Sequence, residues 1–305
     1  MSSPSVAALL VLGGVVCLYL GAEALVRGAT RLALGLGLRA AVVGVTVVAF
    51  ATTTPELFVA LLASTDYSTT LGLGAVIGSN IANVGLVLGV SALVRPIAVG
   101  SEVLRRQVPF MLGATVLLVV LAVDGTVSRF DGVVFLLALG VFTASLLFRS
   151  RGRGATVSTV APRDLLFIVV GLLALLLGAR ALIEGGTDLL TGFGVPPRVV
   201  GLTVLALGTS LPELATSVVS ARRDNGAVSV ANVVGSNIYN VLAVLGVLAL
   251  VVPVDVPASV VTADLPALVV FTVGVVALMI HRRDVSRVDG AVLLCGYAVF
   301  VALLV

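Results

Sequence analysis

Two six-residue segments each place a carboxylate beside a proline and several hydroxyl or small residues, within apolar surroundings. Residues 208–213 read GTSLPE inside the apolar run 199–219, and residues 51–56 read ATTTPE inside the run 40–63. A carboxylate at the centre of a membrane helix costs about 2.5–3.5 kcal/mol on insertion scales. Neither run contains Arg or Lys. Both carboxylates therefore need a compensating partner from elsewhere.

The chemistry of these segments favours binding of a hard cation. Pro55 and Pro212 lack an amide hydrogen, so each leaves a helix carbonyl without its usual donor. Carbonyl, hydroxyl and carboxylate oxygens suit Ca²⁺ or Na⁺, whereas zinc and copper prefer nitrogen and sulfur ligands. Two carboxylates without a basic partner could be neutralised by one divalent ion or by several monovalent ions.

A second pair of segments supplies further polar groups. Residues 78–83 read GSNIAN and residues 235–240 read GSNIYN. The Ser and the second Asn of each segment are four residues apart, so they share one helix face. Asn80 and Asn237 point about 100° away from that face, and we expect them to hydrogen-bond helix backbone. A single hydroxyl could serve only to hydrogen-bond one helix to another. That structural role does not explain two buried carboxylates.

These segments belong to an internal duplication. Shifting the chain by 157 positions superimposes the two carboxylates, the two GSNI sequences and, further along, Pro96 on Pro253, without a gap. Polar residues and prolines kept in register over about 70 positions predict two related halves. We expect a first repeat over 1–150 with its motifs in 40–96, and a second over 163–305 with its motifs in 197–253. A short linker, 151–162, would join them.

Composition predicts an all-α polytopic membrane protein. The chain is 59% apolar and 11% charged, with a mean hydropathy of +1.24, too little polar surface for a water-soluble protein of this size. Five spans in each half would make the second repeat enter the membrane from the opposite side, giving ten transmembrane helices as two inverted repeats of five. The ten apolar segments are 5–26, 40–63, 71–94, 106–123, 130–148, 164–183, 197–220, 227–252, 259–280 and 288–305.

Arginine placement predicts the orientation in a cell membrane. Fifteen arginines follow odd-numbered spans, whereas only Arg129, Arg180 and Arg198 lie on the other face. The positive-inside tendency therefore places both termini outside and the 149–163 loop in the cytoplasm. No basic face with interleaved aromatic residues is present, which argues against a nucleic-acid partner. Cys17 and Cys295 stand alone in apolar segments and are expected to be buried thiols.

The paired motifs GTSLPE and GSNIYN resemble the signature repeats of the sodium/calcium exchanger branch of the cation/calcium exchanger superfamily. The resemblance covers both halves and the spacing between motifs, and it is to the prokaryotic type without a large regulatory loop. It implies ten helices in an inverted repeat around a central site for one Ca²⁺ or several Na⁺.

The resemblance also implies the site residues. Calcium coordination falls to Glu56 and Glu213, with Thr52 and Thr209 through their backbone carbonyls, and Asn83 and Asn240 complete the centre. The implied sodium ligands are Ala49, Thr52, Thr53, Ser79, Ala206, Thr209, Ser210, Ser236, Glu56 and Glu213.

The sequence departs from the usual motif in places. The first copy has Ala51 and Thr54 where the usual form has Gly and Leu. Asn240 stands where some members have Asp, which argues against the potassium-dependent type. The GNxxE pattern of the calcium/proton branch is absent from both repeats, which favours Na⁺ as the counter-ion.

The sequence therefore predicts a sodium/calcium antiporter that works by alternating access. A calcium/proton or other cation exchanger and a cation channel are the alternatives. No HExxH or GxSxG motif is present, so we expect no enzyme activity. We expect no cofactor; Ca²⁺ and Na⁺ are the transported ions, and the other partners are membrane lipids, with no obligate protein partner.

Overall fold

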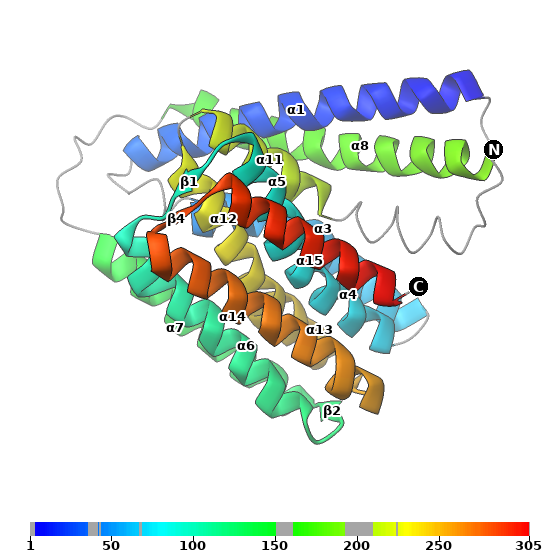
Figure 1. Ribbon diagram of the computed structural model, residues 1–305, viewed down its shortest axis with the longest axis vertical. Helices are drawn as coiled ribbons and strands as arrows, with labels where there is room; N and C mark the ends of the chain where they lie inside the picture. The colour runs from blue at the N-terminus through cyan, green and yellow to red at the C-terminus, as the bar shows by residue number, and fades with distance from the viewer. Residues whose placement is uncertain are drawn as a thin grey trace.

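The computed structural model describes residues 4–35, 42, 44–66, 69–150, 161–192, 210–223 and 225–304. These residues form a bundle of helices with four two-residue strands (Figure 1). The elements of the first half are α1 (Pro4–Gly35), η1 (Gly44–Val48), α3 (Ala49–Asp66), α4 (Thr69–Ala82), η2 (Asn83–Leu88), α5 (Gly89–Val94), β1 (Ile97–Ala98), η3 (Val103–Gln107), α6 (Val108–Ala122), β2 (Thr126–Val127) and α7 (Arg129–Ser150).

The described part of the second half repeats this order, except that the positions equivalent to η1 lie outside the described residues. Its elements are α8 (Pro162–Gly192), α11 (Leu211–Arg222), α12 (Gly226–Tyr239), η5 (Asn240–Leu245), α13 (Gly246–Val251), β3 (Val254–Asp255), η6 (Val260–Asp264), α14 (Leu265–Arg282), β4 (Asp284–Val285) and α15 (Arg287–Leu304). The η elements are π-helical turns. The bounds of α4, η2, α5 and η3 recur 157 positions later in α12, η5, α13 and η6. The two halves therefore share local structure as well as sequence.

Seven helical stretches among the described residues are long and apolar enough to cross a membrane: Pro4–Leu32, Gly72–Val94, Val103–Ala122, Arg129–Leu146, Pro162–Gly186, Gly226–Val251 and Val260–Arg282. Their outer surfaces are apolar, as the exposed Leu9 and Leu137 illustrate. Cys17 and Cys295 are exposed as well. The prediction that they are buried was wrong, because apolar residues of a membrane protein can face lipid instead of the core.

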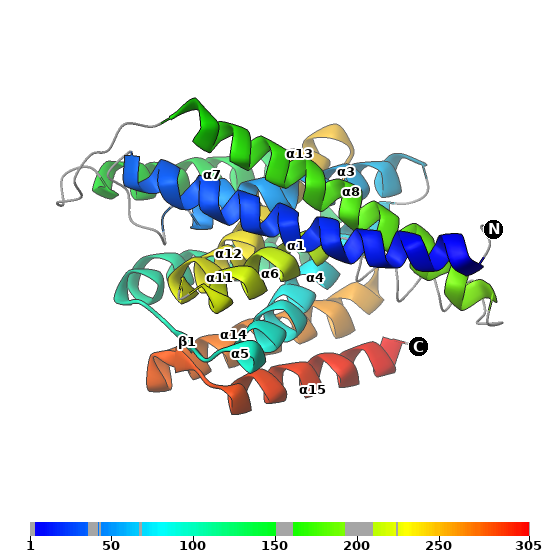
Figure 2. The same cartoon turned by 90° about the horizontal axis from the view of Figure 1, so that it is seen from above.

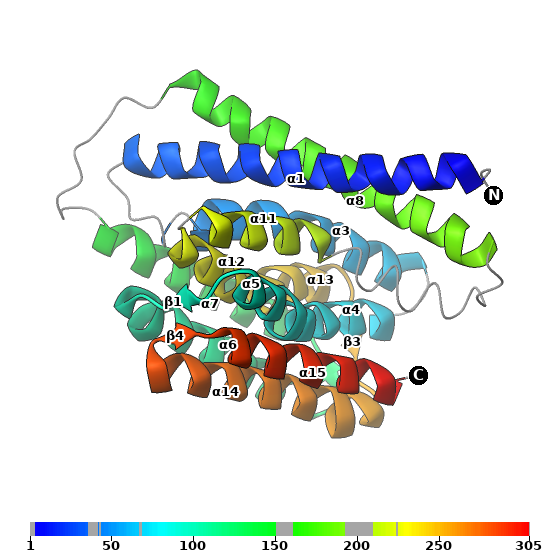
Figure 3. The same cartoon turned by 45° about the horizontal axis from the view of Figure 1, so that its top comes forward.

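Helices α1 and α8 pack against each other along a stripe of glycines. Gly14, Gly21 and Gly28 of α1 recur every seven residues. An added Cβ at Gly21 would lie 2.8 Å from the backbone nitrogen of Leu175, and one at Gly171 would lie 2.5 Å from that of Leu25. The backbones are thus in close contact, as small residues allow in membranes. Figures 2 and 3 show α1 and α8 together over one side of the remaining bundle.

Two short antiparallel strand pairs join the halves. Strand β1 pairs with β4, placing Ile97 opposite Val285, and β2 pairs with β3, placing Val127 opposite Val254. Each pair takes one strand from each half. The main hydrophobic core likewise draws on both halves.

Candidate cation-binding site

Four helical segments bring the two motif pairs together beside α1 and α8. Segments α3 and α11 carry the glutamates, and they lie between the α1–α8 pair and the helices α14 and α15 (Figure 3). Helix α3 contacts η5 and α12 of the other half, while α11 contacts η2 and α5. Helix α3 therefore packs against the segment of the second half that carries Ser236 and Asn240, and α11 packs against the turn of the first half that begins at Asn83.

The two carboxylates meet in the interior. Glu56 is 4% exposed and Glu213 is fully buried. Their carboxyl groups are close enough for direct electrostatic interaction, and Thr52 lies next to the carboxyl group of Glu213. None of the ion pairs recorded in the described part of the chain involves either glutamate. Two adjacent buried carboxylates without a basic partner form a strong candidate site for a cation.

The Ser and Asn residues of the two GSNI segments are also buried. Ser79 is 5% exposed, and Ser236, Asn83 and Asn240 are at 0%. Asn83 begins the π-helical turn η2, and Asn240 begins η5. Such turns are frequent at functional sites because they re-aim side chains and backbone groups. The sequence did not predict them.

Many polar atoms here have no protein partner. A buried polar group without a hydrogen bond costs about 1–3 kcal/mol, so this concentration is costly unless a ligand supplies the contacts. In the described part of the chain, the unpartnered oxygens of the predicted site are Thr53 Oγ1, both carboxylate oxygens of Glu56 and Glu213, Oδ1 of Asn83 and Asn240, and Oγ of Ser210 and Ser236.

The remaining predicted ligands fall into two groups. Ala49 and Thr52 are buried on α3, and the Thr52 hydroxyl donates to the Ala49 carbonyl at 3.3 Å. Ala206 and Thr209 lie outside the described residues. Among the described residues no group of three or more His, Cys, Asp or Glu is placed to hold a metal. The donors are thus two carboxylates with neutral oxygens, a set that suits Ca²⁺ or Na⁺.

Asn80 and Asn237 connect the two halves. The Asn80 amide donates to the backbone carbonyl of Asn237 at 3.4 Å, as expected for a contact to helix backbone. The Asn237 amide contacts Met111 Sδ at 3.9 Å instead. For Asn237, therefore, the expected backbone partner was wrong, because α6 of the first half brings a sulfur to this position.

A polar cluster next to Glu213 was not predicted from the sequence motifs. The Thr216 hydroxyl contacts the carbonyls of Pro212 and Glu213 at 2.8 and 3.0 Å. The Asn232 amide donates to Thr216 Oγ1 at 3.2 Å and to Ser217 Oγ at 3.0 Å. This network links the first turn of α11, which carries Glu213, to α12. Its signal in the sequence is an Asn within a run of valines and alanines, where the first half has Ala75.

The fold and this oxygen-rich centre define a helical membrane protein whose two related halves share a buried cluster of unpartnered oxygens, which is a candidate cation site. The chain belongs to the sodium/calcium exchanger family, whose sequence profile, described as sodium/calcium exchanger protein, matches residues 6–148 and 164–305. The family consists of membrane transporters and not enzymes.

Individual relatives are similar to this protein over nearly the whole chain. Inner membrane protein YrbG of Escherichia coli K12 is 34% identical over 97% of this chain and 96% of its own length. Sodium/calcium exchanger MaX1 of Methanosarcina acetivorans is 28% identical over 97% of both chains. A solved structure of the sodium-calcium exchanger NCX_Mj, soaked with zero Na⁺ and Ca²⁺, superimposes with a TM-score of 0.88 at 28% identity, covering 98% of this chain and 99% of that one.

Proposed function

We propose that this protein is an antiporter that exchanges Ca²⁺ for Na⁺ across the cell membrane. The observation that carries the proposal is the pair of buried carboxylates, Glu56 and Glu213, surrounded by oxygens without protein partners. Membership of the sodium/calcium exchanger family supports the choice of ions.

In this proposal both ions use one site. One Ca²⁺ neutralises both carboxylates, with Thr52 and Thr209 adding backbone carbonyls. Several Na⁺ ions instead use the carboxylates together with Ala49, Thr52, Thr53, Ser79, Ala206, Thr209, Ser210 and Ser236, while Asn83 and Asn240 complete the centre. An empty site with two ionised carboxylates is costly to enclose in a low dielectric. The ion-free protein therefore resists switching sides, which makes exchange obligatory.

Alternating access would follow from ten spans in two inverted repeats, 1–150 and 163–305, joined by the linker 151–162. The strand pairs support inversion. Strands β1 and β3 occupy equivalent places in the two repeats, but β1 pairs with β4, the counterpart of β2. Strands β1 and β2 flank the helical stretch 103–122, which is about 30 Å long. Equivalent strands therefore lie at opposite ends of the bundle. In this proposal both termini lie outside and the 149–163 loop lies in the cytoplasm, as the arginine distribution predicts.

Calcium uptake into proteoliposomes tests the proposal. Purified protein is reconstituted into Na⁺-loaded vesicles, which are diluted into K⁺ buffer or into Na⁺ buffer. We expect calcium uptake only with the outward Na⁺ gradient, and loss of uptake in Glu213→Gln. Glu102→Gln is the matched control, since Glu102 is not one of the predicted ion ligands and pairs with Arg106 at 3.5 Å; it should retain uptake.

Other outcomes would point elsewhere. Uptake that ignores sodium but follows a pH gradient would identify a calcium/proton exchanger. Calcium entry without any opposing ion gradient would indicate a channel. Wild-type flux in Glu213→Gln would refute the assigned site.

A further inference from the structure

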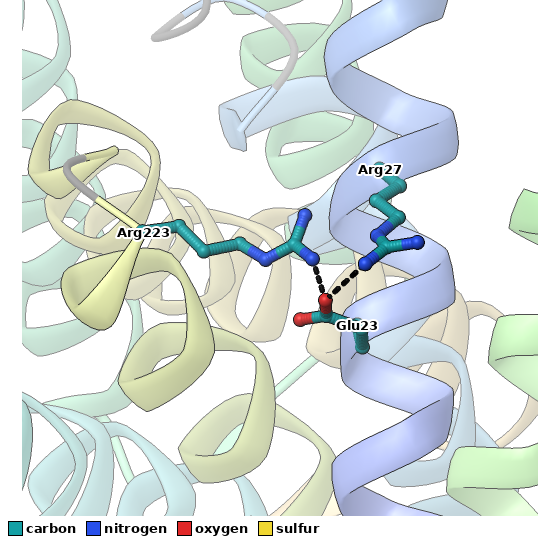
Figure 4. Close-up of polar contacts among 3 residues, drawn as sticks. All are labelled: Glu23, Arg27 and Arg223. Carbon is teal, nitrogen blue, oxygen red and sulfur yellow. Dashed lines mark hydrogen bonds and ion pairs between the residues drawn. The ribbon is translucent and has the colours of Figure 1, made fainter.

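A charged contact ties α1 to the end of α11. Glu23 of α1 accepts a hydrogen bond from Arg27, one turn further along, at 2.8 Å. Its same oxygen also pairs with Arg223, which directly follows α11 (Figure 4). The Glu23 side chain is only 19% exposed. The contact joins the first repeat to the second at one end of the bundle.

The internal duplication reverses every charge of this contact. Shifting by 157 positions places Glu23 on Arg180 and Arg27 on Glu184, within the matching segments GAEALVRG and GARALIEG. The same shift places Asp66 opposite Arg223. The second repeat thus presents an arginine where the first has a glutamate, and the first presents an aspartate where the second has an arginine.

The counterpart residues lie at the other end of the bundle. Helices α1 and α8 run antiparallel, since Gly14 meets Gly178 and Gly28 meets Asp164. Arg180 is therefore about 11 residues, or about 16 Å, along α8 from the level of Glu23. Asp66 ends α3, as Arg223 follows the end of α11. The two sets of residues thus occupy equivalent positions along the chain at opposite ends of the bundle.

Arg180 is paired differently from Glu23 in this conformation. It donates to Glu184 of its own helix at 2.7 Å, and its side chain is 78% exposed. Within the part of the chain that the structure describes, no ion pair links Arg180 to another helix. Among the described residues, the ion pair between the repeats is thus present for Glu23 and Arg223, whereas the counterpart Arg180 pairs within its own helix.

We propose that these charges form two alternating ionic latches, Glu23–Arg223 in the present conformation and Arg180–Asp66 in the opposite one. The inference rests on the proposed alternating access. In an inverted repeat the opposite conformation exchanges the roles of the two halves, so a contact between the repeats is replaced by the contact of the equivalent residues. The equivalent residues, Arg180 and Asp66, also carry opposite charges, so they can form an ion pair in the opposite conformation.

The Glu23–Arg223 pair is partly exposed, with side chains 19% and 29% exposed, so its effect on the balance between conformations is modest. Pairs of this kind contribute about 0.2–1 kcal/mol, which is about a 1.4- to fivefold change in an equilibrium. Because the two latches are similar, each offsets the other, and neither conformation is favoured strongly. Removing one latch should therefore bias the protein toward the other conformation and slow exchange.

Cross-linking during turnover tests the proposal. In a Cys17→Ser/Cys295→Ser background, one variant carries Glu23→Cys and Arg223→Cys, and a second carries Arg180→Cys and Asp66→Cys. A short bifunctional thiol reagent is added to proteoliposomes that are exchanging ions. We expect both pairs to link, each link to stop exchange, and reduction of the reagent's disulfides to restore it. Glu23→Cys with Asp66→Cys is the matched control, which should not link because the two positions lie at opposite ends.

A charge exchange provides a second test without cross-linking. Asp66→Arg should slow exchange by about 1.4- to fivefold, and adding Arg180→Asp should restore the rate. If the 180/66 pair fails to link in a protein that exchanges ions, or if the double charge exchange rescues nothing, the second latch is overturned and the proposed function stands. If the background protein does not exchange ions at all, the proposed function fails, and the latches lose their basis with it.

Discussion

Asn232→Ala should weaken calcium binding as well as the fold, because Asn232 holds the turn that carries Glu213. Its amide makes two hydrogen bonds, to Thr216 Oγ1 and Ser217 Oγ. Asn232 is 1% exposed, and both partners are fully buried. Thr216 in turn contacts the carbonyls of Pro212 and Glu213. The substitution therefore removes the two hydrogen bonds that the Asn232 amide of α12 donates to α11.

The magnitude follows from the two lost bonds. At about 0.5–1.5 kcal/mol each, they predict a loss of about 1–3 kcal/mol in the free energy of unfolding. The position itself tolerates alanine in a helix, as Ala75 at the equivalent place in the first repeat shows. The loss should thus come from the hydrogen bonds and the space left by the amide, and not from helix propensity.

Two assays on purified protein check this reasoning. Thermal unfolding in detergent should show a lower midpoint for Asn232→Ala. Calcium uptake should show a raised KM with a smaller change in kcat, because Glu213 is misplaced but present. Asn232→Gln, which keeps the amide on a longer side chain, should recover part of the binding. An unchanged midpoint together with an unchanged KM would refute the positioning role.

Two further predictions concern the helix contacts and the ion site. Gly171→Ala should destabilise the protein by about 1–3 kcal/mol, because its new methyl group would press on the backbone of α1. Gly13→Ala is the control, since nothing lies within 4 Å of an added Cβ there; a thermal midpoint equally lowered in both would contradict the tight packing of α1 on α8. Asn240→Asp should add a third carboxylate to the centre and make calcium uptake fall more steeply at acidic pH than in the parent. A pH profile of uptake identical to that of the parent would place Asn240 outside the ion site.

Much of the fold could be predicted from the internal duplication in the sequence. Because the offset of 157 positions is a property of the sequence, it anticipated the repeated bounds of α4, η2 and α5 in α12, η5 and α13. The unusual residues Glu56 and Glu213 pointed to the centre because carboxylates are costly there. Their burial and proximity agree with that prediction.

Other features depend on tertiary contacts that no local pattern reveals. The π-helical turns beginning at Asn83 and Asn240 have the same composition as ordinary helix. The sulfur partner of Asn237 comes from a helix 126 positions away. The ion pair between Glu23 and Arg223 likewise joins segments far apart in the sequence. The counterpart residues Arg180 and Asp66 are identified only when the offset of 157 positions is applied to this ion pair.

In the proposed mechanism Ca²⁺ and Na⁺ compete for one site built on Glu56 and Glu213. The most direct measurement is titration calorimetry of the purified protein with Ca²⁺ at a series of Na⁺ concentrations, in K⁺ of constant total ionic strength. Competition for one site predicts that Na⁺ raises the apparent Kd for Ca²⁺ progressively and that Glu56→Gln/Glu213→Gln binds no Ca²⁺ at this site. Calcium binding that is independent of Na⁺, or that survives the double substitution, would contradict it.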